Sequence, residues 1–331
     1  MAAYLFAYSL LLGCIIPFQR PISETLEPLK RAQQIGSQTG DIEFACLNAN
    51  LYASALFFSN ATLPVVSNQV GDIINMMSTR RQDSMLVMVK PFQQLTHNLM
   101  GLTDDPMTLS GDALELEDAT QHAEETKNAS SLVCIRLQKV TLSYLFCDFE
   151  SAGKLAREIE ALPFPAPGIQ QIFAQFFIGM THLATARIYK GAMRRKCLRT
   201  AKKIIKQFKV WSLNSPHNCL PMKFLLQAQL ASLQGKNKKA YEKYTAASAL
   251  ASDSGFRMVE AMTHEHAGRH LFAIGDESLS AASFRKALSC YEEWGAKAKH
   301  AHLQDEIRKL FQSSNVDYCL SNTCSRSRNF I

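Results

Sequence analysis

The sequence lacks the motifs that build a phosphate site. No loop of the form G-x-x-x-x-G-K-[ST] or G-x-G-x-x-G occurs in the 331 residues, and the H-R-D and D-F-G segments of protein kinases are missing as well. Phosphate chemistry depends on a cradle of backbone amides, which such loops provide. We therefore expect this chain to have no ATPase or kinase activity, no catalytic residues and no cofactor.

Paired cysteines are also missing. The chain has nine cysteines, an odd number, and no two of them form a C-x-x-C pair. Most lie in apolar, helix-like stretches, where a thiol behaves as a small hydrophobic group. Disulfide frameworks usually belong to much shorter secreted chains. These features predict a reducing, cytoplasmic environment.

The apolar run over residues 2–16 is the one candidate for a targeting segment. No Lys or Arg precedes it, as one would in a signal peptide, and the run is short for a membrane-spanning helix. Residues 1–16 are therefore either a buried helix or a cleaved signal, and the residues favour the helix. We expect no association with a membrane.

Helical periodicity is present almost throughout, whereas short alternating strands joined by Asn-Gly or Asp-Gly turns are not found. Over residues 42–58, apolar side chains recur every three to four positions, as on the buried face of a helix. Asp41 stands before this run, where its carboxylate can cap the free first-turn N–H groups. The pattern predicts an all-α fold, with N-terminal helical repeats in residues 1–102.

An acidic stretch separates two helical halves. Residues 103–127 carry eight Asp and Glu residues against Lys127 alone, and Pro106 and Gly111 interrupt the pattern. This composition predicts a solvated acidic loop. Residues 313–331 lack apolar periodicity and are predicted to be a disordered tail.

The second helical half, residues 128–312, repeats one pattern of residues. A turn residue is followed by a small residue five positions later, an aromatic residue four further on, and a second small residue three after that. Two copies start forty residues apart: Gly235, Ala240, Tyr244 and Ala247, then Gly275, Ser280, Phe284 and Ala287. An earlier copy starts at Cys147, and a weaker one at Gly191. Helix pairs of this kind bury both faces only by stacking on neighbours, which predicts an α-solenoid of antiparallel helix pairs.

The first of these copies resembles the tetratricopeptide repeat at its turn glycine and its small, aromatic and small positions. Gly268, seven residues before Gly275, falls on the glycine of the family's first helix. The present units are longer than the family's repeat of about 34 residues. Phe224 or His264 stands at the family's Trp position, and no Pro closes each unit. The resemblance implies a tetratricopeptide-like solenoid.

A more specific resemblance covers roughly residues 1–311. Segments 39–45 (TGDIEFA), 98–101 (NLMG) and 287–303 (ALSCYEEWGAKAKHAHL) look like the long helical region of large signalling ATPases. In that family the region follows a protein-kinase domain and an ATPase domain, and often precedes a sensor domain and a histidine-kinase module. The most distinctive part runs from Tyr291 through Trp294 and Gly295 to Lys299, where we expect a stacked aromatic pair and a sharp glycine turn. The resemblance implies a role in signalling.

Three histidines lie close together at positions 264, 266 and 270. His266 and His270 are four residues apart, a spacing that suits two zinc ligands, but H-E-x-x-H is not satisfied and no third ligand is evident. His264 and Glu265 also resemble a phospho-acceptor pair, without an accompanying nucleotide lid. We interpret the three as histidines on a helix surface and expect no metal site.

The basic segment, residues 187–209, is the sharpest charge feature. It contains ten Lys and Arg residues and no acid, with apolar residues at helical spacing, so it predicts a basic amphipathic helix. The simplest interpretation is a solenoid helix with a solvated outer face. Among functional interpretations an acidic protein surface is favoured and nucleic acid is not; residues 103–127 could be an intramolecular partner. The candidate partner-binding residues are Arg194, Arg195, Arg199, Lys202, Lys203 and Lys206.

The function predicted by these features is that of a non-catalytic scaffold or regulatory region, which binds a protein partner or a neighbouring signalling domain. Two alternatives stay open. The chain could be a fragment of a multidomain ATPase or protein kinase whose catalytic domains lie outside it, or a solenoid that binds anions or nucleic acid through residues 187–209.

Overall fold

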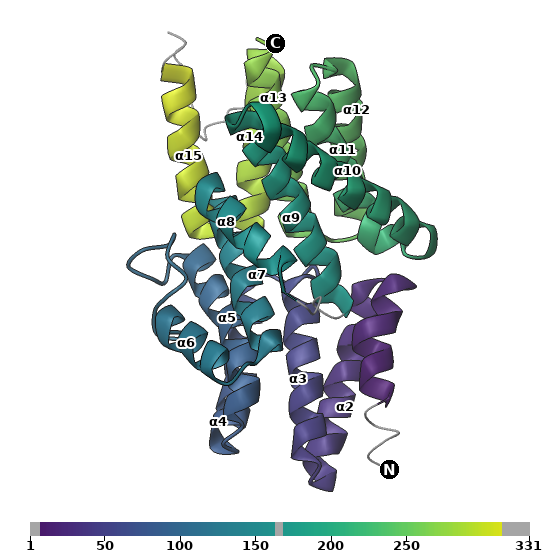
Figure 1. Ribbon diagram of the computed structural model, residues 1–331, viewed down its shortest axis with the longest axis vertical. Helices are drawn as coiled ribbons and strands as arrows, with labels where there is room; N and C mark the ends of the chain where they lie inside the picture. Colours follow the sequence, from purple (N-terminus) through teal and green to yellow (C-terminus); the bar gives the residue numbers. More distant parts are fainter. Residues whose placement is uncertain (1–6, 163–167, 313–331) are drawn as a thin grey trace, which may run out of the picture.

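The computed structural model describes residues 7–162 and 168–312, and every named element in these two ranges is a helix (Figure 1). The predicted all-α fold class is therefore confirmed for this part of the chain. The first elements are three short helical turns and five α-helices: η1 (Leu11–Ile15), η2 (Ile16–Phe18), η3 (Ile22–Thr25), α2 (Leu26–Thr39), α3 (Ile42–Phe57), α4 (Leu63–Thr79), α5 (Asp83–Met100) and α6 (Leu116–Glu125).

The later elements are all α-helices. They are α7 (Ala129–Leu145), α8 (Phe149–Glu160), α9 (Gly168–Ile188), α10 (Gly191–Asn214), α11 (Pro216–Leu233), α12 (Asn237–Asp253), α13 (Arg257–Ala273), α14 (Glu277–Trp294) and α15 (Lys297–Gln312). Helices adjacent in sequence pack against one another, most extensively α13 with α14 and α11 with α12.

Local sequence signals set several of the helix ends. The Asp41 carboxylate accepts a hydrogen bond from the Phe44 N–H at 3.2 Å, so the predicted N-cap of α3 is present. Asp148 and Asp276 cap α8 and α14 in the same way. The turns before α12 and α14 place Gly235 and Gly275 at φ of +68° and +85°, in the left-handed region that favours glycine.

The repeated positions of the second half lie inside the helix pairs. Ala240, Tyr244 and Ala247 of α12 are buried, as are Ser280, Phe284 and Ala287 of α14. Small residues at these positions allow two helices to approach closely, and the ring fills the space between them. At the turn before α8, Cys147 takes the place of the glycine and has a φ of +65°.

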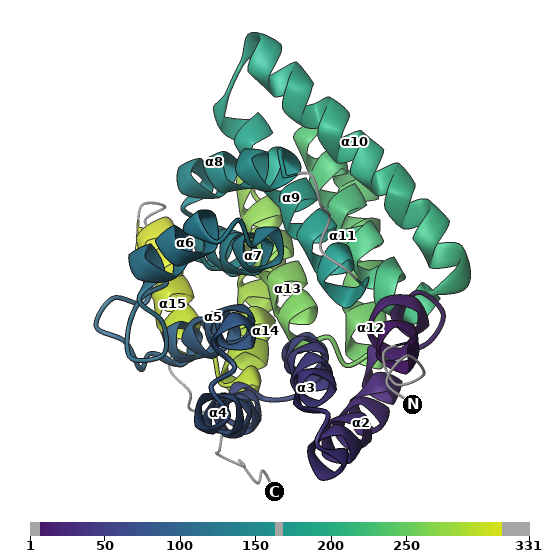
Figure 2. The same ribbon diagram turned by 60° about the horizontal axis from the view of Figure 1, so that its bottom comes forward.

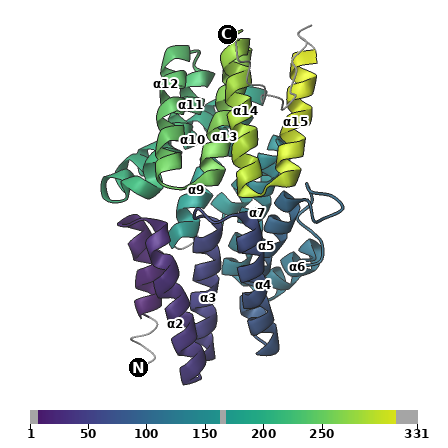
Figure 3. The ribbon, with the colours of Figure 1, turned by 180° about the vertical axis from the view of Figure 1, so that it is seen from behind.

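Contacts between distant parts of the sequence join the two halves (Figures 1 and 3). The helices α2 to α5, purple to blue, lie below α11 to α15, green to yellow. The last helix, α15, packs on α5. Trp294 at the end of α14 meets Phe57 of α3 edge-on at 6.2 Å between ring centroids, and Phe58 stacks on Phe173 of α9 at 3.7 Å. One continuous apolar core therefore spans both halves.

The start of the described chain is attached to the turn between α10 and α11. The Ser215 hydroxyl and the Asn218 side-chain amide both donate to the carbonyl of Pro17, at 2.9 and 2.6 Å. Residues 7–18 are helical and Leu12 is buried against the core, whereas residues 1–6 lie outside the described residues. Within the described ranges, no helix has both the length and the apolar character needed to cross a membrane.

The acidic stretch is not a loop throughout, which corrects the interpretation of residues 103–127. Its second part forms α6, and a small apolar cluster joins Ala123 of this helix to Leu132 and Ile135 of α7. Leu116, Ala119 and Ala123 recur at helical spacing on the face that packs, while the acids lie on the other faces. The many acids concealed this short apolar pattern. The predicted tail, residues 313–331, lies outside the described residues.

A polar cavity and a basic helix as candidate functional sites

A buried carboxylate in α13 organises the polar interior of the second half. Glu265 is 3 % exposed and accepts hydrogen bonds from the Tyr291 hydroxyl at 2.6 Å and from the Lys299 ammonium at 2.8 Å. Arg269, one turn along the same helix, lies 2.6 Å from the same carboxylate. Lys299 is fully buried and Arg269 is half-buried, so Glu265 faces two positive charges, one of them wholly in the interior.

The charges of this network compensate one another. Burial alone would raise the pKa of Glu265, but the Arg269 and Lys299 charges outweigh burial and hold the pKa well below its usual range. Burial alone would lower the pKa of Arg269, and Glu265 is the main group that raises it instead. A buried ion pair of this kind fixes one arrangement of α13, α14 and α15, because removing one member leaves an uncompensated charge.

Arg269 also connects the network to the turn between α7 and α8. Its Nε and Nη2 atoms bind both oxygens of Glu306 of α15, at 2.7 and 2.6 Å, and Nη2 lies 3.1 Å from the Cys147 sulfur. Burial raises the pKa of the Cys147 thiol, despite the lowering effect of Arg269. The thiol is therefore protonated near neutral pH and is not an activated nucleophile.

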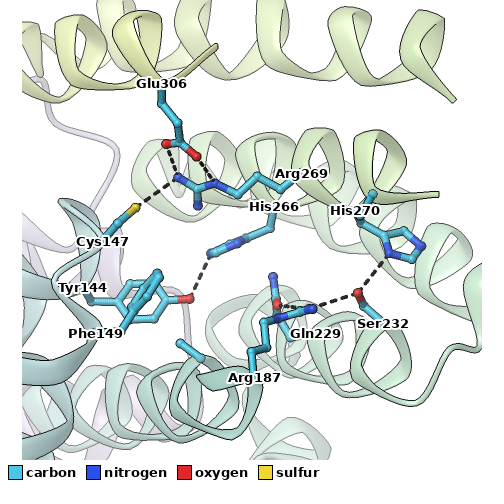
Figure 4. A pocket seen from close by; sticks show the side chains of 12 residues that line it. Tyr144, Cys147, Phe149, Arg187, Gln229, Ser232, His266, Arg269, His270 and Glu306 are labelled. Carbon is cyan, nitrogen blue, oxygen red and sulfur yellow. Dashed lines mark hydrogen bonds and ion pairs between the residues drawn. The ribbon is translucent and has the colours of Figure 1, made fainter. Parts of the chain in front are cut away.

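A cavity of about 320 Å³ opens beside this network, between α7, α9, α11, α13 and α15 (Figure 4). The Tyr144 hydroxyl and His266 Nε2 lie 3.0 Å apart on one wall. Burial, assisted by Arg269, lowers the pKa of His266 to about 3, and burial raises the pKa of Tyr144. The imidazole is therefore neutral, and the tyrosine hydroxyl donates to it.

Arg187, at the end of α9, lines the opposite wall of the cavity. Its Nη2 donates to Gln229 at 3.1 Å and to the Ser232 hydroxyl at 3.0 Å, both neutral acceptors, and it forms no ion pair with a residue in the described ranges. Ser232 in turn lies 2.9 Å from His270 Nδ1. In Figure 4 the Arg187 and Arg269 guanidinium groups approach the cavity from opposite sides.

The cavity is chemically suited to bind an anion. Two guanidinium groups line it, and its single carboxylate, Glu306, is fully engaged by Arg269. The thiol of Cys147 and the hydroxyl of Tyr144 are both protonated, so neither is prepared for attack on a substrate. Arg269 is shared by Glu265 and Glu306, so Arg187 is the guanidinium of the cavity without a carboxylate partner among the described residues.

The interpretation of the three neighbouring histidines as surface residues is wrong for two of them. His266 and His270 are buried, and His264 is half-buried. Because α13 contacts α11, α12 and α14, it has little free surface. His266 and His270 are also not a ligand pair, because their nitrogens face Tyr144 and Ser232.

The aromatic pair expected at Tyr291 and Trp294 is not stacked. The Tyr291 hydroxyl points to Glu265 and its ring faces the Lys299 ammonium, 5.6 Å from the ring centroid. Trp294 packs edge-on against Phe57 instead. Gly295 has a φ of +89°, which is the sharp left-handed turn expected there.

The basic segment forms most of α10, which runs along an outer edge of the molecule (Figure 2). One side of α10 is buried against α9 and α11 through Cys197, Ala201, Ile204 and Phe208. On the other side, Arg195, Arg199, Lys202, Lys203 and Lys206 are exposed, whereas Arg194, one turn before Cys197, is half-buried. We call these six residues the basic face; within the described chain none of them forms an ion pair.

Positive charge continues from α10 onto the next two helices. Burial, followed by the charges of Lys243 and Lys209, lowers the pKa of Lys223. These lysines belong to α10, α11 and α12, so like charges gather across three helices. The Lys243 ammonium lies 4.3 Å from the centroid of the Phe224 ring, which partly stabilises it.

The acidic stretch is not the intramolecular partner of the basic face, as the sequence had allowed. The two lie on opposite sides of the molecule (Figures 1 and 2). Glu124 of α6 pairs instead with Arg136 of α7 at 3.3 Å. The short connection from α6 to α7 holds the acids near their own helix pair.

No protein-family model matches this sequence, and no curated protein matches it.

The cavity residues Tyr144, Arg187, Ser232 and Glu306 were not expected from the sequence, because they come from four helices that no local pattern relates. Only the spacing of Glu265 and Arg269, four residues apart, was a local sign of the ion network.

Proposed function

We propose that the chain is a non-catalytic scaffold, built as a tetratricopeptide-like solenoid, that binds an acidic segment of a protein partner along the basic face of α10. The observation that carries the proposal is the exposure of five of these six cations, with no ion pair from any of the six to a described residue. The recurring small and aromatic positions of α12 and α14 support the solenoid.

Like charges on adjacent turns of a helix repel one another. Pairs such as Arg195 and Arg199, or Lys202 and Lys206, each cost a few tenths of a kcal/mol by the usual i,i+4 magnitude, about 0.2–0.5 kcal/mol. An acidic partner relieves this repulsion on binding and is attracted over a distance of about 10 Å at ordinary salt. The charge pattern therefore favours fast, salt-sensitive association with an acidic surface.

Exposed apolar residues at both ends of α10 favour a protein over a nucleic acid. Met193 at the start and Val210 and Leu213 near the end are exposed, Leu213 to 77 %. Apolar side chains beside cations match an acidic peptide that also carries hydrophobic residues. A nucleic-acid backbone would use the cations alone. The sequence resemblance to signalling ATPases makes a neighbouring signalling domain our favoured source of that peptide, with catalytic domains outside this chain.

The test is a charge-reversal triplet with a matched control. The Lys202→Glu/Lys203→Glu/Lys206→Glu variant changes net charge as much as Lys30→Glu/Lys154→Glu/Lys309→Glu, whose lysines are exposed elsewhere. Binding of a synthetic Asp/Glu- and Leu-containing peptide is followed by fluorescence anisotropy over a salt series. We expect at least a tenfold loss for the first triplet and a small change for the control.

Two results would contradict the proposal. Equal losses in both triplets would show that net charge, and not the basic face, attracts the peptide. Tight binding of single-stranded DNA with no binding of the peptide would favour the nucleic-acid alternative.

A further inference from the structure

Three metal-ligating side chains meet on the outer side of the α13–α14 pair. Glu260 and His264 belong to α13 and Cys290 to α14, and one ligand atom from each lies within 4.8 Å of the other two. All three residues are half-buried, so solvent reaches the group while the helices hold it in place.

The two helices bring these residues together by simple geometry. Glu260 and His264 are four residues apart and therefore lie on one face of α13, a turn from each other. The pair of α13 and α14 is the most extensively packed in the molecule's described part, which fixes Cys290 opposite that face. The three donors are held by rigid elements, and loops contribute none of them.

A second group of three possible ligands, one thiol and two carboxylates, shows what distinguishes this one. Cys147, Glu265 and Glu306 also bring their ligand atoms within 4.8 Å of one another. There, Arg269 and Lys299 occupy the space between the donors as ion-pair partners. The protein thus supplies its own cations to that group.

No cation of the described chain forms an ion pair with Glu260 or His264. Arg257 is the nearest paired cation: it binds Glu293 at 3.6 Å and donates to the Asn60 carbonyl at 3.0 Å. Lys286 acts on His264 and Cys290 only through its charge and pairs with no described carboxylate. The neutral side chain of Ser252 also acts on the pKa of Glu260, which it lowers.

Burial and nearby charges of both signs, among them Arg257 and Lys286, act on the three donors. Burial, together with Glu260 and Glu293, raises the pKa of Cys290 to about 12. Burial also raises the pKa of Glu260, and burial with the Lys286 charge lowers the pKa of His264 to about 4. A divalent cation between the donors would stabilise the carboxylate and the thiolate and bind the imidazole in its neutral form.

We propose that Glu260, His264 and Cys290 form a binding site for a zinc ion. Thiolate, imidazole and carboxylate are the three ligand types that zinc takes in proteins, and three protein ligands leave one coordination position for water or a further ligand. The bound ion would link the N-terminal half of α13 to the C-terminal half of α14. This inference does not depend on the proposed binding of an acidic partner.

Binding changes the protonation of one residue. Zinc takes the Cys290 side chain as thiolate, so the thiol proton passes to solvent. We expect one proton to be released per ion and the affinity to rise roughly tenfold per pH unit below the thiol pKa. Calorimetry in buffers of different ionisation enthalpy measures this proton.

The main experiment is a Co²⁺ titration, because Co²⁺ accepts the same ligands and a bound thiolate gives a sulfur-to-cobalt charge-transfer band. The full-length chain carries Cys319→Ser and Cys324→Ser, because those two thiols lie outside the described residues and could bind cobalt themselves. We expect one equivalent of Co²⁺ to produce the band and Zn²⁺ to remove it.

Variants locate the ion. Cys290→Ser should abolish the band, and His264→Gln and Glu260→Gln should each weaken Co²⁺ binding at least tenfold while keeping the thiol. Cys147→Ser is the matched control and should leave the titration unchanged. Circular dichroism shows which variants are folded, and if Cys290→Ser is not, the His264 and Glu260 variants decide. Absence of the band, or its loss in the Cys147 variant alone, would overturn the proposal.

Discussion

The ring of Phe284 in α14 lies directly against the backbone of Gly268 in α13. A Cβ atom at Gly268 would come within 2.8 Å of the nearest ring carbon, and real Cβ atoms do not approach so closely. Phe284 is buried, and its ring also meets Phe311 of α15 edge-on. The absence of one side chain on α13 thus allows α14 and α15 to close over it.

Gly268→Ala should therefore destabilise the protein, although alanine is the better helix former. We expect a loss of about 1–3 kcal/mol in the free energy of unfolding, the usual cost of overpacking a core. Urea unfolding followed by circular dichroism measures it. Gly71→Ala in α4 is the control, because a Cβ atom at Gly71 would find no atom closer than 3.9 Å. This substitution should stabilise α4 slightly, since alanine is the better helix former. Equal effects of the two substitutions would show that Phe284 can move aside.

Glu265 should make the free energy of unfolding depend on pH in the acidic range. Its pKa is lowered in the folded state, so its contribution is complete above the unfolded value of about 4.3 and is lost as the pH falls towards the folded value. Glu265→Gln should unfold at lower urea than the natural protein at pH 7, and the difference should narrow at pH 3. A constant difference at both values would mean that Arg269 and Lys299 do not stabilise the carboxylate.

His266 should remain neutral through the physiological range. Burial and Arg269 lower its pKa to about 3 in the folded state. The unfolded chain takes up a proton near pH 6.5, so stability falls as the pH drops from about 6.5 towards 3. In nuclear magnetic resonance spectra the His266 ring signals should not titrate above about pH 4. Titration of His266 near pH 6.5 would show that burial and Arg269 do not hold it neutral.

The cavity beside Arg187 should bind inorganic phosphate. Binding to the folded state alone stabilises it by about 1.4 kcal/mol when phosphate is tenfold above its dissociation constant. We therefore expect phosphate to raise the melting temperature of the natural protein, relative to chloride at equal ionic strength. The increase should disappear in Arg187→Ala and persist in Arg308→Ala, which removes an exposed arginine paired with Asp305. The same increase in both variants would place phosphate elsewhere.

Local patterns predicted the helices and several of their ends, because these depend on residues close in sequence. Asp41 and Gly235 illustrate this: a cap and a left-handed turn each act within a few positions. The spacing that identified the basic face also predicted which side of α10 is buried. In α6 the same type of signal was present but weak beside eight acids.

Contacts between distant segments could not be predicted in this way. Trp294 meets Phe57 across more than two hundred residues, and nothing local to either residue indicates the other. The burial of His266 and His270 depends on helices packed on several sides of α13, whereas the periodicity of a sequence indicates one buried side of a helix. For the same reason no local pattern relates His264 to Cys290, which lies on the next helix.

The attachment of both ends of the described chain has a mechanical consequence. An array that touches only nearest neighbours stretches and bends like a spring, because each joint yields separately. Here the segment at Pro17 is held by Asn218, and α15 rests on α5. Extending this part of the chain must first break these contacts between residues distant in sequence. It should therefore resist extension more than helix pairs that contact only their nearest neighbours.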